Sequence, residues 1–421
     1  MNSLKGKARA LMVIAPVLAL AQAALAQDGG TGSADRAEQL ARELLIVDTH
    51  IDVPYRLHRT WQDVSKPTAD GDFDHPRAQA GGLDAAFMSI YIPAAIDAEG
   101  GAAALADKLI DSVERIARNA PDKFALATCA DDLMAIKATG RVALPLGMEN
   151  GGPIGGDFAN LRHFHERGIR YVTLAHSRSN HISDSSYDSF KRWQGLSPFG
   201  KRLVAEMNGL GTMIDVSHLS DQAFWQVIEL SRAPVIASHS SLRHFTPGFE
   251  RNMSDEMVAA LGRNGGVIQI SFGSVFLTPT AIAYSAGQRK AAMGFAFNRQ
   301  LNEGDARVAE FMAQYRSANP YPYATLDDAL NHFDRAVALA GIEAVGVGSD
   351  YDGVGDSLPV GLKDASTYPN LIQGLLGRGY SEQDIAKILG GNVMRAWRAV
   401  EALAESNGNP PQCSAAAAPA A

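Results

Sequence analysis

Residues 211–240, GTMIDVSHLSDQAFWQVIELSRAPVIASHS, contain the unit that decides the fold. Two short apolar runs, Thr212–Val216 and Pro234–Ala237, flank the helical pattern Asp221–Leu230. Apolar runs that do not alternate with polar residues are typical of parallel strands buried on both faces. The stretch therefore predicts a strand–helix–strand unit of an α/β protein.

The same alternation of strand and helix continues along the chain. Six further apolar runs are predicted as strands, namely Leu44–Val47, Leu83–Ile90, Val142–Leu146, Ile169–Leu174, Gly266–Ile270 and Ala344–Val347. Eight strands that alternate with helices predict a (β/α)8 TIM-type barrel rather than an open doubly wound sheet. A Gly-rich dinucleotide fingerprint is absent after the first strand, which also argues against the open sheet. Pro145 lies inside the third strand, and because proline lacks an N–H we expect a bulge there.

The two ends of the chain differ from the barrel domain predicted for residues 30–404. Residues 1–26 have a basic head, an apolar stretch at Leu11–Ala23 and the small-residue sequence Ala24-Leu25-Ala26, which together predict a cleaved signal peptide. We therefore expect a protein secreted to a bacterial periplasm, without a membrane anchor. The Pro- and Ala-rich residues 405–421 predict a disordered tail.

Residues 273–325 interrupt the alternation after the seventh strand. They contain a helical pattern around Gln288–Tyr315 but no convincing strand. A helical insertion of this length could cover the mouth of the barrel, contact another subunit or decorate the periphery. The sequence leaves these three interpretations open.

Charge and cysteine content exclude some classes of function. The net charge of −8 becomes −11 without residues 1–26, which carry three cations and no acid. A surface this acidic does not attract nucleic acid or anionic lipid. Cys129 and Cys413 are the only cysteines, and they are as compatible with one disulfide as with two free thiols. Thiolates therefore cannot build a metal site in this chain, which leaves histidines and carboxylates.

Seven side chains of metal-ligand or acid–base type each follow a predicted strand. In a parallel α/β barrel the carboxyl ends of the strands meet at one face, where active sites are built. For His218 and His239, which follow the fifth and sixth strands, the alternative to a metal-ligand role is that they are buried histidines satisfied by hydrogen bonds. The number of such residues instead predicts a metallohydrolase with these candidates: His50, Asp52, Glu149, His176, His218, His239 and Asp350.

Three histidines and two carboxylates are more ligands than one tetrahedral ion needs. Glu149 stands among glycines, where the backbone can approach a ligand closely, and is the predicted bridging carboxylate. The other ligands then divide into His50 with Asp52 on one ion and His218 with His239 on the second. Two ions about 3.5–4 Å apart can share a hydroxide and polarise a carbonyl.

The remaining candidates suit acid–base and substrate-binding roles. Asp350 is the predicted proton shuttle, and Asp352, two residues on, competes for that role. His176 suits an oxyanion or substrate contact. Arg251 could pair with a substrate carboxylate, although a surface arginine before a helix has the same spacing. His181 is a further candidate for the pocket wall.

At these residues the chain resembles the membrane (renal-type) dipeptidase family, the zinc peptidases of family M19. The resemblance covers about Ile46 to about Arg398. Its motifs are His50-Ile51-Asp52, Gly81-Gly82-Leu83, Gly168–His176, Gly195–Gly200, Ile214–His218, Ser238–Ser241, Arg251-Asn252, Gly348-Ser349-Asp350 and Ile388–Asn392.

This resemblance implies a barrel of the metal-dependent amidohydrolase type with two zinc ions. It places His50, Asp52 and Glu149 on one ion, and Glu149, His218 and His239 on the other. Substrate would contact His176, Arg251 and Asp350, so that Glu149, His176 and Asp350 are the expected catalytic residues. The implied reaction is hydrolysis of dipeptides, with a D-residue tolerated at the C-terminal position, by a homodimer.

Two alternatives remain at the level of the sequence. The first is a related dinuclear amidohydrolase that acts on a β-lactam, an N-acyl D-amino acid or a phosphoester. A neutral substrate would not need Arg251. Replacement of Arg251 by alanine should therefore leave activity intact in such an amidohydrolase but not in a dipeptidase. The second is a metal-holding module without turnover, which would have no use for Asp350.

Overall fold

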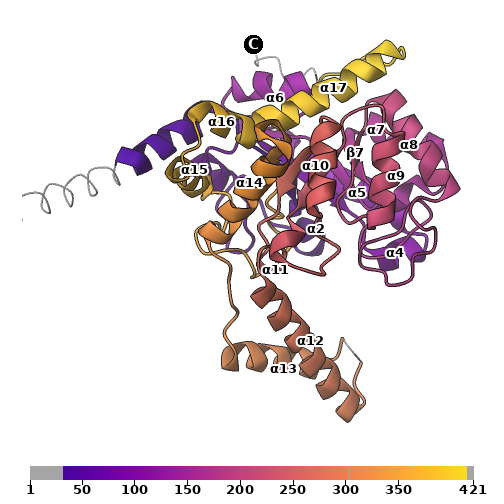
Figure 1. Ribbon diagram of the computed structural model, residues 1–421, viewed down its shortest axis with the longest axis vertical. Coiled ribbons are helices and arrows are strands. Elements are labelled where there is room, and N and C mark those ends of the chain that lie inside the picture. Colours follow the sequence, from indigo (N-terminus) through magenta and orange to yellow (C-terminus); the bar gives the residue numbers. More distant parts are fainter. Residues whose placement is uncertain (1–31, 303, 415–421) are drawn as a thin grey trace, which may run out of the picture.

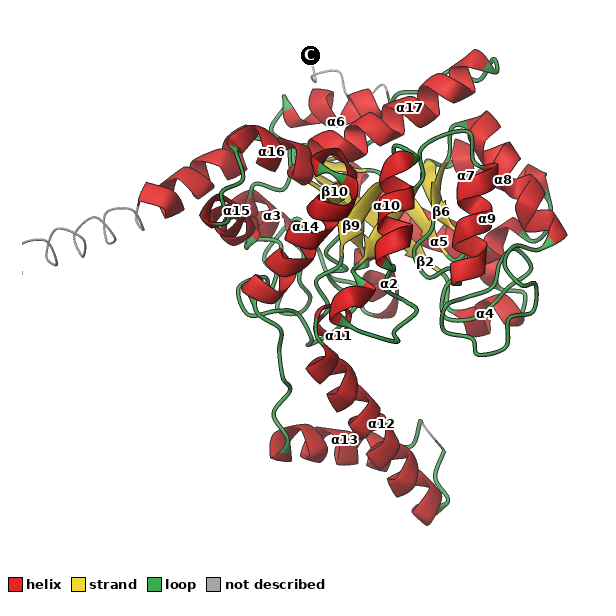
Figure 2. Cartoon of the chain, in the orientation of Figure 1, coloured by secondary structure: helices red, strands yellow, loops and turns green. Residues whose placement is uncertain are grey.

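The computed structural model describes residues 32–302 and 304–414 (Figure 1). The predicted signal peptide, residues 1–26, lies outside the described residues. Within them, a curled sheet of parallel strands is surrounded by helices, as Figure 2 shows. The predicted (β/α)8 TIM-type barrel architecture is therefore confirmed.

The described part of the sheet has ten short strands, all paired in parallel. Their order is β10-β9-β8-β7-β6-β5-β2-β4-β3, and β1 pairs with β2. The backbone N–H of Asp350 donates to His50 O at 3.1 Å, and that of Asp52 donates to Tyr351 O at 2.9 Å. These bonds join the end of β1 to the chain after β10. The strands are β1 Val47–Ile51, β2 Ala85–Tyr91, β3 Phe124–Leu126, β4 Val142–Leu144, β5 Leu146–Glu149, β6 Ile169–Thr173, β7 Met213–Asp215, β8 Ile236–Ser240, β9 Val267–Ile270 and β10 Val345–Val347.

Helices cover the outside of the sheet, and several begin at a serine cap. The side chains of Ser197, Ser220 and Ser254 each accept a backbone N–H three residues on, which satisfies one of the free donors of the first turn. Residues 32–43 are helical. The other helices are α2 Val53–Arg59, α3 His75–Gly81, α4 Ala94–Ala98, α5 Ala102–Asn119, α6 Ala130–Lys137, α7 Phe158–Glu166, α8 Pro198–Leu210, α9 Asp221–Leu230, α10 Asp255–Arg263, α11 Ser274–Leu277, α12 Pro279–Arg299, α13 Ala306–Ala318, α14 Leu326–Ala340, α15 Tyr368–Gly377, α16 Glu382–Ala386 and α17 Asn392–Ser406.

The third predicted strand is divided in two at Pro145. Strand β2 pairs with β4 before the proline and with β5 after it. Pro145 has no N–H to donate, but its carbonyl accepts the N–H of Met88 at 2.8 Å. The break lets β5 carry Glu149 to the end of the sheet while β4 and β3 extend the sheet beside it.

Residues 273–325 contain the helices α11, α12 and α13, and the helical pattern predicted around Gln288–Tyr315 is divided between α12 and α13. Helix α12 ends because Gln300 adopts a left-handed conformation (φ 54°), and the Asp305 side chain caps α13. Figure 1 shows α12 leading away from the barrel with α13 lying across it. Their shared apolar core is small: Ala292, Ala296 and Val308.

The tail after α17 is attached to the barrel, so the prediction of disorder is wrong for residues 405–414. Cys413 forms a disulfide with Cys129, at the start of α6. Beside it, the Asn409 side chain donates to Gly209 O at 2.9 Å. Residues 415–421 lie outside the described residues. No helix in the described part of the chain is both long and apolar enough to cross a membrane.

Candidate metal centre and active site

Strand β1 supplies His50 and Asp52 to one end of the barrel. The two residues are two positions apart, and His50 Nε2 lies 3.4 Å from Asp52 Oδ2. Both side chains are buried. The predicted pair of ligands from the first strand therefore converges.

Glu149, at the end of β5, is the centre of the cluster. Its Oε1 atom lies 3.1 Å from His218 Nε2, 3.2 Å from His239 Nε2 and 3.4 Å from His176 Nε2. Its Oε2 atom lies 3.5 Å from His50 Nε2. One carboxylate thus presents an oxygen to each of two groups of ligands, as a bridging residue must.

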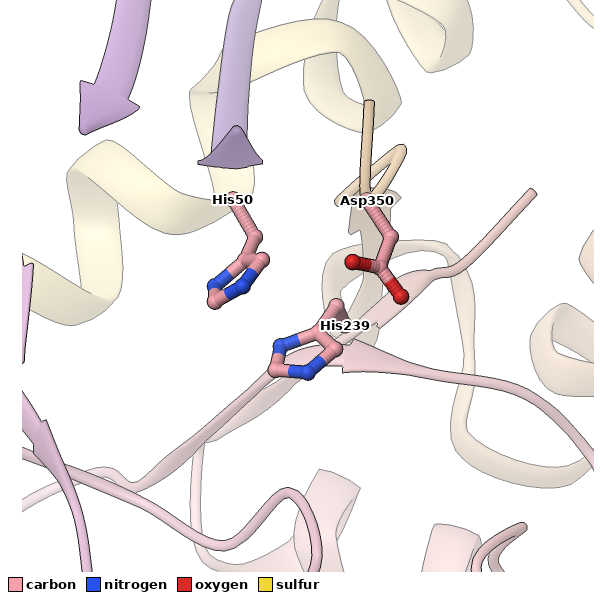
Figure 3. Close-up of side chains that lie close together, drawn as sticks. All are labelled: His50, His239 and Asp350. Atoms are coloured by element: carbon pink, nitrogen blue, oxygen red, sulfur yellow. The ribbon is translucent and has the colours of Figure 1, made fainter. Parts of the chain in front are cut away.

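Asp350 reaches the same centre from the loop after β10. Figure 3 shows its carboxylate beside the rings of His50 and His239, and one ligand atom of each lies within 4.8 Å of the others. Asp350 has a left-handed backbone (φ 64°). A Cβ at Gly353 would lie 2.2 Å from Asp52 Oδ2 and 2.3 Å from Asp350 Oδ1, so only glycine lets these two carboxylates approach.

Hydrogen bonds determine which ring nitrogen of His50 carries the proton and which carries the lone pair. Tyr171 OH lies 2.8 Å from His50 Nδ1 and donates to Thr49 O at 3.0 Å. Because the phenol has one proton, it accepts from His50 Nδ1–H. The Nε2 atom of His50 is then left with its lone pair toward Glu149 and Asp52.

His239 is oriented by an equivalent relay. Its Nδ1 atom lies 2.8 Å from Ser238 Oγ, which donates to Asp215 Oδ2 at 2.6 Å. Because the serine proton is donated to Asp215, the hydroxyl accepts from His239 Nδ1–H. The Nε2 atom of His239 then carries a lone pair and lies 2.8 Å from His218 Nε2. Neither Asp215 nor Tyr171 was predicted from the sequence to have a role. Asp215 nevertheless ends a strand and is the kind of carboxylate that supports a ligand histidine.

The residues present fit a metal ion. His50 Nε2 and Asp52 Oδ1 are buried and have no hydrogen-bond partner among the described residues. Buried polar atoms of this kind are costly unless they bind something. Imidazole nitrogens and carboxylate oxygens are donors that suit zinc. This set could hold two ions.

Electrostatics keep His218, His239 and Glu149 in their metal-binding forms. His50 differs: burial alone would lower its pKa, but Tyr171, Glu149 and Asp52 outweigh burial and raise that pKa well above its ordinary value. Burial, with Arg251 and His176 nearby, holds the pKa of His218 well below its ordinary value. Burial, with His50 nearby, does the same to the pKa of His239. Burial alone would raise the pKa of Glu149, but the adjacent histidines outweigh it and lower that pKa well below its usual range. Two neutral histidines, His218 and His239, and an ionised glutamate are therefore available together.

Asp350 differs from the other carboxylates. Burial, reinforced by the negative charges of Asp52 and Glu149, raises the pKa of Asp350 well above its ordinary value. A carboxyl group with a raised pKa holds its proton more readily than an ordinary carboxyl, which suits acid–base work. Asp352, the other candidate, instead pairs with Arg56, with Nε and Oδ2 3.1 Å apart.

The cluster forms one end of a cavity of about 660 Å³. The residues that line it include several that the sequence did not single out, among them Tyr55, Arg59, Tyr187 and Arg289. Arg289 belongs to α12, so the insertion contributes to the wall of the cavity.

Arg251 and His181 are placed differently from the other candidates. Arg251 is buried beside the ligands, where its Nη2 donates to His239 O at 2.6 Å and lies 3.0 Å from His218 Nε2. It is therefore next to the cluster but is not among the residues that line the cavity. His181 accepts the N–H of Gly156 at 3.1 Å and also lies outside the lining.

Comparisons with known proteins identify related proteins and agree with this fold. The family described as membrane dipeptidase (peptidase family M19) matches residues 34–411. Dipeptidase 3 of Mus musculus is 32% identical over 382 residues, which are 89% of this chain and 68% of the mouse protein. Dipeptidase aclJ of Aspergillus oryzae is 34% identical over 343 residues, or 80% of this chain and 72% of the fungal protein.

Two solved structures are similar over most of their length. The probable dipeptidase PvdM from Pseudomonas aeruginosa has a TM-score of 0.77 and 29% identity, and the match covers 89% of this chain and 99% of that one. A metallo peptidase from Rhodobacter sphaeroides, liganded with a phosphinate mimic of the dipeptide L-Ala-D-Ala, has a TM-score of 0.69 and 25% identity over 85% of this chain and 99% of that one.

A parallel barrel with histidines and carboxylates gathered at the carboxyl ends of its strands defines a barrel metallohydrolase. The family match over residues 34–411 narrows this class. The chain belongs to the membrane dipeptidase family, peptidase family M19, and is a metallopeptidase.

Proposed function

We propose that this enzyme is a zinc-dependent dipeptidase that tolerates a D-residue at the C-terminal position. The observation that carries the proposal is Glu149, whose Oε1 atom lies 3.1, 3.2 and 3.4 Å from three histidine Nε2 atoms at the closed end of the cavity. The named dipeptidases among its relatives and the phosphinate dipeptide mimic bound by the Rhodobacter sphaeroides enzyme support this substrate class.

Two zinc ions would be held by five residues, with Glu149 shared between them. His50 and Asp52 would complete one site, and His218 and His239 the other. When bound, zinc supplies a hydroxide nucleophile at neutral pH and polarises the scissile carbonyl. The hydrogen bonds of Tyr171 and Ser238 to the ligand histidines keep the rings aimed at these sites.

Asp350 is the proposed proton carrier. Its carboxylate lies beside His50 and His239, and its raised pKa lets it take a proton from the nucleophile and give it to the leaving amine. The ring of His176 lies edge-on to the ring of Tyr91, and the two ring centroids are 4.8 Å apart. Burial lowers the pKa of His176, so a neutral ring can donate one N–H to the developing oxyanion.

Arg251 is the proposed partner of the free carboxylate of a dipeptide. Its guanidinium is held by Ser240 Oγ at 2.8 Å and by His239 O at 2.6 Å, and its Nε has no partner among the described residues. A fork fixed beside His218 would hold a substrate with a carboxylate one residue beyond the scissile bond. This geometry favours dipeptides over longer peptides.

A substrate panel tests the proposal. Zinc-loaded protein is assayed with L-L and L-D dipeptides, a tripeptide, an N-acyl D-amino acid and a β-lactam, with a chelator-treated control. The expected result is chelator-sensitive cleavage of the dipeptides of both kinds. Cleavage of the lactam or the N-acyl compound alone would assign the site to a related amidohydrolase.

We also infer that the enzyme works as a homodimer outside the cytoplasm, in a periplasm. The Cys129–Cys413 disulfide supports an oxidising compartment, because such bonds seldom persist in the cytosol. The signal-like composition of residues 1–26 is consistent with export. Cell fractionation and sedimentation velocity of the mature protein test the two statements separately.

A further inference from the structure

The outer part of the active-site cavity is basic, whereas its floor is acidic. Asp52, Glu149 and Asp350 are buried at the floor. Arg59, the last residue of α2, and Arg289, in α12, are exposed and line the same cavity. The cavity therefore carries two cations on the side from which a substrate enters.

These two arginines have no protein partner within the described part of the chain. Neither Arg59 nor Arg289 makes a hydrogen bond or ion pair there, whereas Arg56 bonds Asp352 and Arg243 bonds Asp221. Arg289 still acts on the cavity, because its charge opposes the burial that raises the pKa of Tyr187. A fork of N–H donors without a partner, facing a cavity, is suited to a carboxylate.

The position of Arg289 depends on the insertion. It is the one described residue of α12 that lines the active-site cavity, and it also lines a groove of about 390 Å³ between α12 and α13. Lys290, the next residue, is exposed but lines neither space. The helix thus directs one of two adjacent cations to the substrate.

We propose that the preferred substrates are dipeptides with an acidic side chain, whose second carboxylate binds Arg59 and Arg289. This inference rests on the dipeptidase function proposed above. The carboxylate common to all dipeptides is assigned to Arg251, so the outer arginines distinguish among dipeptides. Each contact lies at an exposed rim, where a charge pair contributes modestly and is weakened by salt.

Matched substrates isolate the second carboxylate. The Ala-Glu and Ala-Gln dipeptides have nearly the same shape, as do Glu-Ala and Gln-Ala, and each pair differs by one charge. With zinc-loaded wild type we expect kcat/KM to favour the acidic member of at least one pair by about tenfold, mainly through KM. Raising the ionic strength from 0.05 M to 0.5 M should reduce this preference.

Variants then test whether Arg59 and Arg289 cause the preference for the acidic dipeptide. Arg289→Met and Arg59→Met should each reduce the Glu-over-Gln ratio by about three- to fivefold and leave the Gln dipeptide within about twofold of wild type. Lys290→Met removes the same charge one residue along α12 and should leave the ratio unchanged. Binding of phosphinate mimics of the two dipeptides, followed by calorimetry, should show the same ratios without turnover.

Three results would overturn the inference. Equal cleavage of the Glu and Gln dipeptides by wild type would contradict it and leave the dipeptidase function intact. An equal loss on both substrates in Arg289→Met would show that this residue does not select the side chain. Absence of cleavage of any dipeptide would overturn the proposed function together with the inference.

Discussion

Tyr171→Phe tests how the protein orients His50. The phenol accepts from His50 Nδ1–H at 2.8 Å and donates to Thr49 O at 3.0 Å. The ring packs against Gly147, where an added Cβ would lie 1.9 Å from Tyr171 Cζ, so phenylalanine keeps the packing and removes only the hydroxyl. The substitution therefore frees His50 to adopt the other tautomer.

Two magnitudes follow from this loss. A supporting hydrogen bond to a ligand histidine is worth about 10- to 100-fold in metal affinity, or about 1.4–2.8 kcal/mol. The buried His50 Nδ1–H and Thr49 O also lose their partner, which costs about 1–3 kcal/mol of unfolding free energy. We expect the weaker affinity at the ion bound by His50 and not at the ion bound by His218 and His239.

Competition with a chromophoric chelator measures the two zinc affinities, and urea unfolding measures the stability. Tyr380→Phe is the matched control, because it removes a phenol that donates to Asp334 at 2.9 Å, outside the metal centre. The control should leave both zinc affinities unchanged. Two unchanged zinc affinities in Tyr171→Phe would refute the tautomer argument, whatever the effect on stability.

Three further outcomes are expected. Asp350→Asn should retain its zinc, measured by elemental analysis, but lose about 10²- to 10⁴-fold in kcat; full activity would remove Asp350 from the mechanism. Burial lowers the pKa of His332 to about 4, so the folded state disfavours its protonation, and stability should fall as the pH decreases below about 7. Between pH 7 and pH 5, His332→Gln should lose about 2 kcal/mol less unfolding free energy than wild type, and equal losses would contradict this. Reduction of the Cys129–Cys413 disulfide should lower the unfolding free energy by about 2–5 kcal/mol, measured in urea with and without reductant, whereas no change would show that the tail adds nothing.

The sequence predicts the barrel and the members of the site because both follow from local pattern. Each strand is a short apolar run, and each candidate ligand follows one, so parallel packing is enough to bring His50, Glu149, His218 and His239 to one end. The structure places these residues within bonding range of one another.

Other features depend on tertiary contacts that have no local signal. Strand β3, Phe124–Leu126, has three residues and forms only because β4 lies beside it. The turn that divides the insertion has a glutamine, Gln300, in a conformation that glycine usually adopts. The Cys129–Cys413 bond joins residues 284 apart in sequence. Arg289 lines the active-site cavity although it belongs to α12, which has no local signal of this contact.

We propose above that two zinc ions bridged by Glu149 give this chain its dipeptidase activity. The most direct test is to add zinc stepwise to metal-free mature protein while hydrolysis of L-Ala-D-Ala is followed. Activity should rise until two equivalents are bound, and Glu149→Gln should bind less zinc and remain inactive. Full activity with one equivalent, or without added metal, would show that the reaction does not need two zinc ions.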